Sequence, residues 1–190
     1  RSTLFPYTTL FRSNQRDIVG IIGENGIGKT TLARTVCGLM KEKTGEVYFE
    51  GQLMNIHMRK QSAFLVMQDP NYQLFSDSVV GEMALSASGE IPSAEDVQRI
   101  LSSLKLISVK DRHPLSLSGG QKQRLCIALA ALSSAQILFF DEPTSGLDFE
   151  NMNRVAKMLR ELSKKKAVIV ISHDNEFLNL ACTRIVSLSK

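Results

Sequence analysis

The chain has 190 residues, 43% of them hydrophobic and 22% charged, and its formal net charge at pH 7 is +4. One domain with a sizeable core fits this length, whereas a mild and scattered positive charge does not favour a nucleic-acid partner. The three cysteines are far apart in apolar surroundings, which predicts reduced thiols, and no apolar run approaches the roughly 18 residues that would span a bilayer.

The first 13 residues show neither helical periodicity nor clean alternation, and Pro6 interrupts them. Residues 3–13 resemble the conceptual translation of a common sequencing-library adapter. We therefore expect residues 1–13 to be non-native and the native sequence to begin near Asn14. The alternative is a genuine, irregular edge strand.

The apolar run 18–22 predicts a buried parallel strand, and a glycine-rich loop and a helix from Thr31 follow it. Glycines let the loop curl so that its N–H groups point at one anion, and the helix adds its N-terminal dipole. Lys29 adds a positive charge, and the Thr30 hydroxyl can bind Mg²⁺. This spacing between a strand and a helix predicts a site for nucleotide phosphates. The residues expected there are Gly23, Asn25, Gly26, Gly28, Lys29, Thr30 and Thr31.

Two strands and a helical stretch are predicted next. Residues 46–50 and 63–67 favour strands, and Gln68 follows the second one, where it is placed to reach a bound ligand. The sequence turns helical from Val79 to about Leu106, with Ser93 as a helix cap. We interpret residues 76–116 as a helical insert.

A second candidate anion site precedes the apolar helix 125–132. Ser118 can cap this helix, and Gly119 and Gly120 expose backbone N–H groups at its start, with Gln121 following. An ordinary helix cap is the alternative explanation, because a Ser-Gly-Gly sequence alone is a weak signal.

Acidic residues end the next buried strand, 137–140. On a parallel sheet this end faces the ligand crevice, where Asp141 can hold Mg²⁺ and Glu142 can orient and deprotonate a water molecule. A solvated acidic turn is the alternative. After a predicted helix over 149–163, the strand 167–172 ends at His173, for which we favour a contact with the γ-phosphate over a helix cap.

With these pieces in order, residues 17–190 resemble the ATP-binding cassette (ABC) family. The matching segments are Gly23 to Thr30 for the Walker A loop, Gln68 for the Q-loop, Leu117 to Gln121 for the signature motif, Ile137 to Asp141 for Walker B, Ser145 to Asp148 for the D-loop and His173 for the switch histidine.

The resemblance implies an α/β P-loop NTPase fold with a parallel core sheet, a partial antiparallel β subdomain and a helical subdomain at about 76–116. It implies ATP and Mg²⁺ as cofactors, with Glu142, His173 and Gln68 as catalytic residues. The metal ligands would be Thr30, Gln68 and Asp141. The nucleotide-binding set would gain Ser118, Gly119, Gly120, Gln121 and Asp148, because two such domains pair head to tail, as a homodimer or heterodimer.

Within the family, Gln-Asp-Pro at 68–70 followed by Gln-Leu-Phe at 73–75 looks like the ATPase of energy-coupling factor importers for vitamins or transition-metal ions. That resemblance implies a transmembrane partner and a peripheral position on the cytoplasmic face of the membrane. The alternative is a soluble ABC ATPase that acts on ribosomes or DNA. One departure concerns the adenine-stacking aromatic that the family places upstream of Walker A, since only residues 1–13, with Tyr7 and Phe11, occupy that region.

Overall fold

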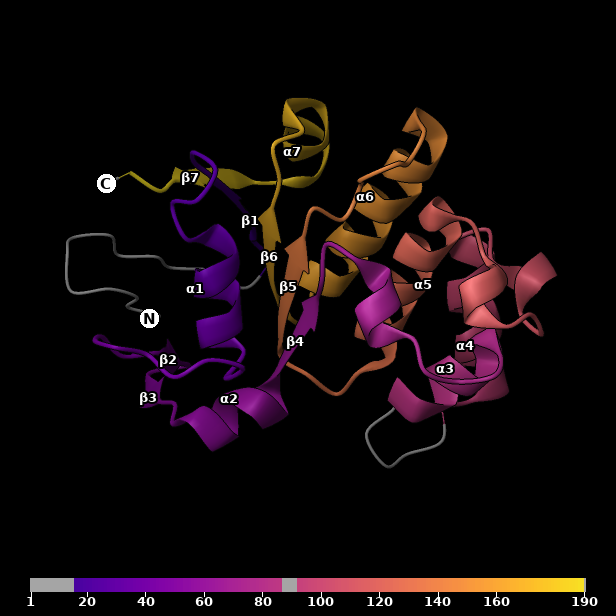
Figure 1. Cartoon of the computed structure of the whole chain (residues 1–190), viewed down its shortest axis with the longest axis horizontal. Coiled ribbons are helices and arrows are strands. Elements are labelled where there is room, and N and C mark those ends of the chain that lie inside the picture. Colours follow the sequence, from indigo (N-terminus) through magenta and orange to yellow (C-terminus); the bar gives the residue numbers. More distant parts are fainter. Residues whose placement is uncertain (1–15, 87–91, 190) are drawn as a thin grey trace.

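The computed structural model describes residues 16–86 and 92–189, and these form an α/β structure around one parallel sheet (Figure 1). The stretch 1–13, with Tyr7 and Phe11, lies outside the described residues. Five strands pair in parallel in the order β4-β5-β6-β1-β7, as expected for the core sheet. These strands are β1 (Ile18–Ile22), β4 (Ala63–Val66), β5 (Ile137–Asp141), β6 (Ala167–Ile171) and β7 (Arg184–Ser187).

The strand register brings the carboxyl ends of three central strands to one level. Ile171 of β6 pairs with Ile21 of β1 on one side and with Asp141 of β5 on the other. The loops that leave these strands therefore start from the same edge of the sheet. A ligand crevice forms at such an edge in open parallel sheets.

Helices cover both faces of the sheet, so the central strands β1, β5 and β6 are apolar on both sides. In β5, Ile137 and Phe139 pack in the core under α1 (Lys29–Val36), whereas Leu138 and Phe140 pack in the core on the opposite face. Figure 1 shows α1 on one side of the sheet and the helices of the other face beyond it. These helices are α5 (Gly119–Leu132), α6 (Phe149–Ser163) and α7 (Asn175–Ala181).

The predicted strand over 46–50 is shorter than expected. Only β2 (Tyr48–Phe49) forms, and it pairs antiparallel with β3 (Gln52–Leu53) before α2 (Ile56–Ser62). Glu50 and Gly51 both have positive φ, 52° and 82°, as a two-residue hairpin turn requires. The turn therefore takes Glu50 out of the strand.

The helical stretch expected from Val79 to Leu106 is divided. α3 (Val79–Ser86) and α4 (Ala94–Ser103) are separate helices, because Pro92 cannot continue a helix and Ser93 starts a new one by accepting a hydrogen bond from Asp96 N. The short turns η2 (Ile107–Val109) and η3 (Pro114–Ser116) complete the segment 76–116, which we propose as a helical subdomain.

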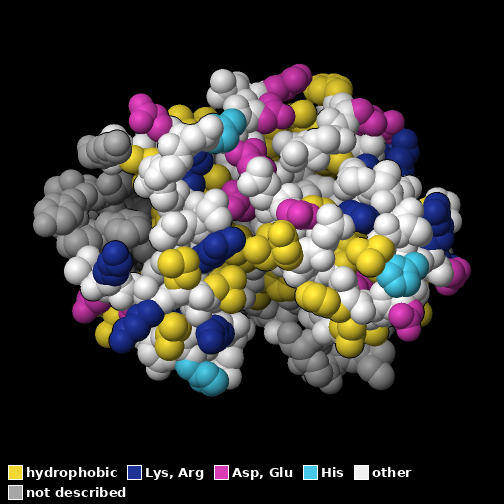
Figure 2. Space-filling view, in the orientation of Figure 1, with side chains coloured by type: hydrophobic (Ala, Val, Ile, Leu, Met, Phe, Trp, Pro, Cys, Tyr) yellow, Lys and Arg dark blue, Asp and Glu magenta, His cyan; other side chains and the backbone are white. Residues whose placement is uncertain are grey.

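Two of the three cysteines, Cys37 and Cys126, are buried. Burial raises the pKa of Cys37 and Cys126 to about 12, so both thiols stay protonated at neutral pH. In Figure 2 the Lys and Arg side chains lie in several separate places among acidic ones on the visible face. Among the described residues, none of the helices combines the length and the apolar character needed to cross a bilayer.

Candidate functional site

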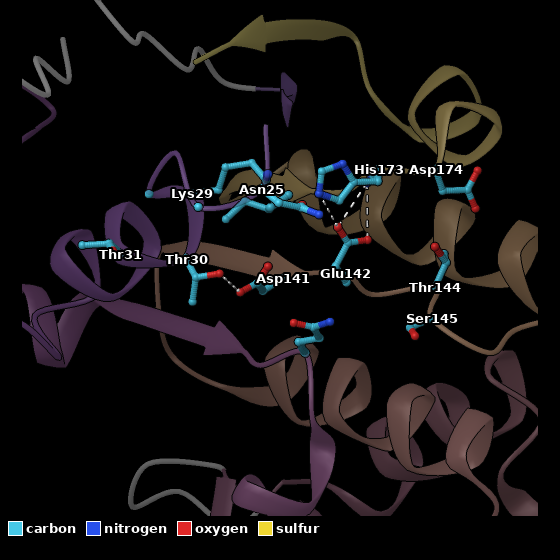
Figure 3. Close-up of a pocket in the computed structure, with 14 residues that line it drawn as sticks. Asn25, Lys29, Thr30, Thr31, Asp141, Glu142, Thr144, Ser145, His173 and Asp174 are labelled. Carbon is cyan, nitrogen blue, oxygen red and sulfur yellow. Dashed lines mark hydrogen bonds and ion pairs between the residues drawn. The ribbon is translucent and has the colours of Figure 1, made fainter. Parts of the chain in front are cut away.

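A cavity of about 610 Å³ opens at the sheet edge where β1, β5 and β6 end. Figure 3 shows Lys29, Thr30, Asp141, Glu142 and His173 lying around it, at the start of α1, at and after the end of β5, and after the end of β6. The complete lining is Asn25, Gly26, Gly28, Lys29, Thr30, Thr31, Gln68, Asp141, Glu142, Thr144, Ser145, Ile171, His173 and Asp174.

Two glycines allow the loop after β1 to take its shape. At Gly23 a Cβ atom would stand 2.8 Å from the carbonyl oxygen of Leu188, so no side chain fits where the loop passes the end of β7. At Gly28 the backbone is left-handed, with φ 107°, and this residue is the N-cap of α1. The helix consequently begins at Lys29, two residues earlier than expected, and its first N–H groups face the cavity.

Lys29 is the cation of this loop. Its side chain is 8% exposed, and its Nζ donates hydrogen bonds to the carbonyl oxygens of Gly23, at 2.7 Å, and Glu24, at 3.0 Å. The charge is therefore held inside the curl of the loop. A phosphate oxygen in the cavity would meet this ammonium group together with backbone N–H groups at the positive end of α1.

Thr30 and Asp141 form the oxygen pair of the site. The Thr30 hydroxyl donates a hydrogen bond of 2.8 Å to Asp141 Oδ2. Burial raises the pKa of the Asp141 carboxyl, while this hydrogen bond and the charges of Arg34 and Lys29 act in the opposite direction. A hydroxyl and a desolvated carboxylate side by side suit a small hard cation such as Mg²⁺.

Protein side chains alone do not form a metal cage here. Among the described residues, no group of three or more His, Cys, Asp and Glu side chains is arranged to hold a metal ion. Gln68, exposed at the end of β4, lines the same cavity and adds an amide oxygen. Such a sparse set of ligands fits a cation that is shared with bound phosphates.

Glu142 is held in an unusual backbone conformation. Its φ is +50°, which costs a residue with a side chain roughly 1–2 kcal/mol, and its N–H donates to Ile171 O at 2.8 Å. The carboxylate accepts hydrogen bonds from Ser172 Oγ, at 3.0 Å, and from His173 N, at 3.1 Å. The His173 ring lies beside it, with Nε2 3.8 Å from Oε1. The strained turn thus fixes a carboxylate at the cavity wall.

Three of the lining residues were missed by sequence reasoning, Thr144, Ile171 and Asp174, and a fourth, Ser145, was named only as part of the D-loop match and not as a site residue. Each follows or ends a central strand, β5 or β6, within four residues of its last position. The predicted strand ends were therefore a sufficient signal for their location. Of these, Asp174 also caps α7 by accepting a hydrogen bond from Phe177 N.

The second candidate anion site lies apart from this cavity. Ser118 and Gln121 form a reciprocal capping box at the start of α5, with Ser118 and Gly119 exposed and Gly120 packed near Leu147. Asp148, expected at the nucleotide, caps α6 by accepting from Asn151 N at 2.8 Å. The cavity lining includes neither the Ser118–Gln121 segment nor Asp148.

Comparison with known proteins identifies relatives of this arrangement. The family model described as ABC transporter matches residues 9–145. A protein of Treponema denticola, named as an ABC transporter ATP-binding protein, is 47% identical over 94% of this chain. The aligned part is 36% of that protein, so the chain spans about a third of the relative's length.

Two further comparisons cover most of both proteins. The energy-coupling factor transporter ATP-binding protein EcfA2 of Caldanaerobacter subterraneus is 31% identical over 97% of this chain and 71% of its own length. The dimeric cassette MJ0796, solved in a post-hydrolysis state with ADP and Pi, superposes with a TM-score of 0.80. It is 26% identical over 94% of this chain and 84% of its own.

The raised pKa of Asp141 gives a prediction for stability. Folding favours the protonated carboxyl, so its contribution is fully present below the unfolded pKa and is lost as pH rises through the folded value. Asp141→Asn keeps an acceptor for Thr30 and removes this loss. We expect the stability of the variant relative to the parent chain to increase between about pH 4 and pH 7.

The measurement is urea unfolding at several pH values without nucleotide or Mg²⁺. Asp111→Asn, at an exposed aspartate, is the matched control and should show a smaller change with pH. A stability difference for Asp141→Asn that stays constant or falls across this range would contradict the prediction.

Proposed function

Because the chain belongs to the ABC transporter family, a family of ATPases, we propose that it binds and hydrolyses ATP to drive transport through a membrane-spanning partner. The observation that carries this proposal is the position of Glu142. Its carboxylate is fixed by Ser172 and His173 at a cavity that also holds Lys29 and the Thr30–Asp141 pair.

The proposed reaction is attack of a water oxygen on the γ-phosphorus of ATP, which breaks the bond to the β,γ-bridging oxygen and releases ADP and inorganic phosphate. Glu142 accepts the proton of this water, and the two hydrogen bonds to its carboxylate aim it into the cavity. Lys29 and the N–H groups at the start of α1 bind the phosphates and stabilise the charge that develops on them. His173, beside Glu142, contacts the γ-phosphate and helps to hold the water in line.

In this proposal the second cofactor is Mg²⁺. Thr30 and Asp141 would hold it, with Gln68 at the mouth of the cavity. The ion would neutralise charge on the phosphate oxygens. The Thr30 hydroxyl donates its proton to Asp141 and keeps its oxygen lone pairs, so it could bind the ion without breaking this hydrogen bond.

We predict that Glu142→Gln retains ATP binding but loses turnover by on the order of 10²-fold or more, because the amide keeps the shape and cannot accept the proton. Phosphate release measures the rate, and calorimetric titration measures ATP affinity. Glu95→Gln, on the exposed surface of α4, is the control and should hydrolyse ATP like the parent chain. Equal rates for Glu142→Gln and the parent would remove Glu142 from this role.

We propose further that the active unit is a dimer of two such cassettes. Ser118 and Gly119, at the positive end of α5, are exposed and lie outside the cavity of their own chain, so an anion bound there would belong to a second subunit. The cassette MJ0796, which shares this fold, is itself dimeric. Each ATP would then lie between Lys29 of one subunit and Ser118 of the other, with Gly119, Gly120, Gln121 and Asp148 nearby.

This arrangement predicts dimers that depend on ATP. In a Glu142→Gln background, which preserves bound ATP, sedimentation with ATP and Mg²⁺ should show a dimer of this chain or, with a paralogous cassette present, a heterodimer. Adding Ser118→Arg should restore the monomer, because a long side chain fills the anion site. Dimers that persist with Ser118→Arg would contradict the head-to-tail model.

For the cargo, we propose an importer of the energy-coupling factor type, for vitamins or transition-metal ions. The likeness to EcfA2 supports this class, together with Gln68-Asp-Pro and the Gln-Leu-Phe that follows. The protein would lie on the cytoplasmic face of the membrane, attached through its partner. Nucleic acid has no part in the proposal, in keeping with the dispersed basic side chains.

The proposed contact with the partner lies in the segment 72–80. Leu74 is buried at 5% exposure and belongs to the core, so it is not available to anchor a partner. Phe75 is 80% exposed and Tyr72 is 69% exposed. Exposed aromatic side chains that follow Gln68 closely in the sequence would let a docked helix of the partner respond to ATP.

We predict that Phe75→Ser spares ATP hydrolysis by the isolated subunit and reduces co-purification with the transmembrane partner by roughly tenfold or more, the loss expected for an aromatic hot spot. Leu115→Ser, at another exposed apolar residue, is the control. Normal co-purification of Phe75→Ser with the partner would show that Phe75 is not part of the contact.

A further inference from the structure

The side chain of Gln73 is bonded to the backbone of a strand. Gln73 lies at the end of the short turn η1 (Pro70–Gln73) and is half-buried. Its Oε1 accepts a hydrogen bond from Met67 N at 2.7 Å, and its Nε2 donates one to Leu65 O at 2.6 Å. Both polar ends of one amide are therefore used on two neighbouring backbone groups.

The Leu65 carbonyl and the Met67 N–H lie on the side of β4 that faces away from its neighbour β5. In the described part of the sheet β4 is an edge strand, with β5 as its neighbour. In a parallel ladder, one residue bonds the C=O before and the N–H after the residue that it faces. The Gln73 amide makes the same pair of bonds around Val66. It thus takes the place of one residue of a further parallel strand and covers the open edge.

The bond to Met67 lies one residue before Gln68. The intervening turn is itself fixed, because Asp69 Oδ1 accepts hydrogen bonds from Asn71 N, at 2.9 Å, and Asn71 Nδ2, at 2.8 Å. Pro70 restricts the backbone at the start of η1. The side chain of Gln68 is exposed, but its backbone is held on both sides, by the bond at Met67 before it and by this turn after it.

We propose that Gln73 is a positioning residue that fixes Gln68 at the mouth of the nucleotide cavity through its two bonds to the edge of β4. Gln73 does not line the cavity, so it acts through Gln68 and not on the ligand. The inference rests on the proposed function, in which the Gln68 amide serves Mg²⁺ and the γ-phosphate. In this role Gln73, the first residue of the Gln-Leu-Phe sequence, contacts its own chain and not a partner.

Removing the clamp should leave the phosphate loop intact and misplace Gln68. For Gln73→Leu, which keeps the side-chain volume, we expect kcat for ATP hydrolysis to fall roughly tenfold, with less than about a twofold change in KM for ATP. The Mg²⁺ concentration that half-saturates the rate should rise. Gln73→Glu can still accept from Met67 N but cannot donate to Leu65 O when ionised. For this variant too, kcat should fall and the half-saturating Mg²⁺ concentration should rise.

The decisive test is a double-mutant cycle with Gln68→Ala. If Gln73 acts through Gln68, adding Gln73→Leu to Gln68→Ala should change kcat by less than about twofold, so the two effects are not additive. Gln98→Leu, at an exposed glutamine of α4, is the control and should leave kcat unchanged in both backgrounds.

A direct readout needs no turnover. Hydrogen exchange of the Met67 amide should be roughly tenfold faster in Gln73→Leu, while the amides of β5 keep their protection. Unchanged exchange at Met67, or additive effects on kcat, would overturn the inference while the proposed function stands. A parent chain that neither binds nor hydrolyses ATP would overturn the proposed function, and the inference with it.

Discussion

The site depends above all on the parallel register of β5, β6 and β1. Ile171 pairs with both Asp141 and Ile21, so three strands end at one level and three loops begin there. If β6 slipped by one residue, its isoleucines and valines would exchange faces, and the core on each side would have to accommodate side chains of a different volume. The apolar packing on both faces of the sheet therefore fixes the distances between Lys29, Glu142 and His173.

This geometry places charged groups where burial is costly. Lys29, at the start of α1, and Asp141, at the end of β5, are both buried, and burial raises the pKa of Asp141. Hydrogen bonds to loop carbonyls and to Thr30 offset part of that cost. An anion near Lys29 and a cation near Asp141 would therefore stabilise these two buried groups. A magnesium nucleotide supplies both charges.

The sequence was sufficient for the parts that depend on local pattern. Apolar runs predicted β1, β4, β5 and β6 to within one residue of their ends, because a strand covered on both faces is a continuous apolar run bounded by turn residues. The helix of 149–163 was predicted with its observed bounds. The predictions of element bounds that were wrong depend on turn geometry. The positive φ of Glu50 makes β2 shorter than predicted, and the left-handed Gly28 makes α1 begin before its predicted start. Propensity alone does not encode either angle.

The segment 73–75 shows why a short sequence resemblance could not assign roles. Three consecutive residues lie in three environments: the Gln73 amide is bonded to the edge of β4, Leu74 is in the core, and Phe75 is in solvent. In an extended strand the first and third residues would share a face, but η1 ends here and the chain changes direction. Glu82, nearly buried, accepts hydrogen bonds from the N–H groups of Phe75 and Ser76 and holds the new direction. A buried carboxylate from α3 thus holds the backbone from which Phe75 points outward, and the proposed partner contact depends on this bond between segments as well as on the aromatic ring.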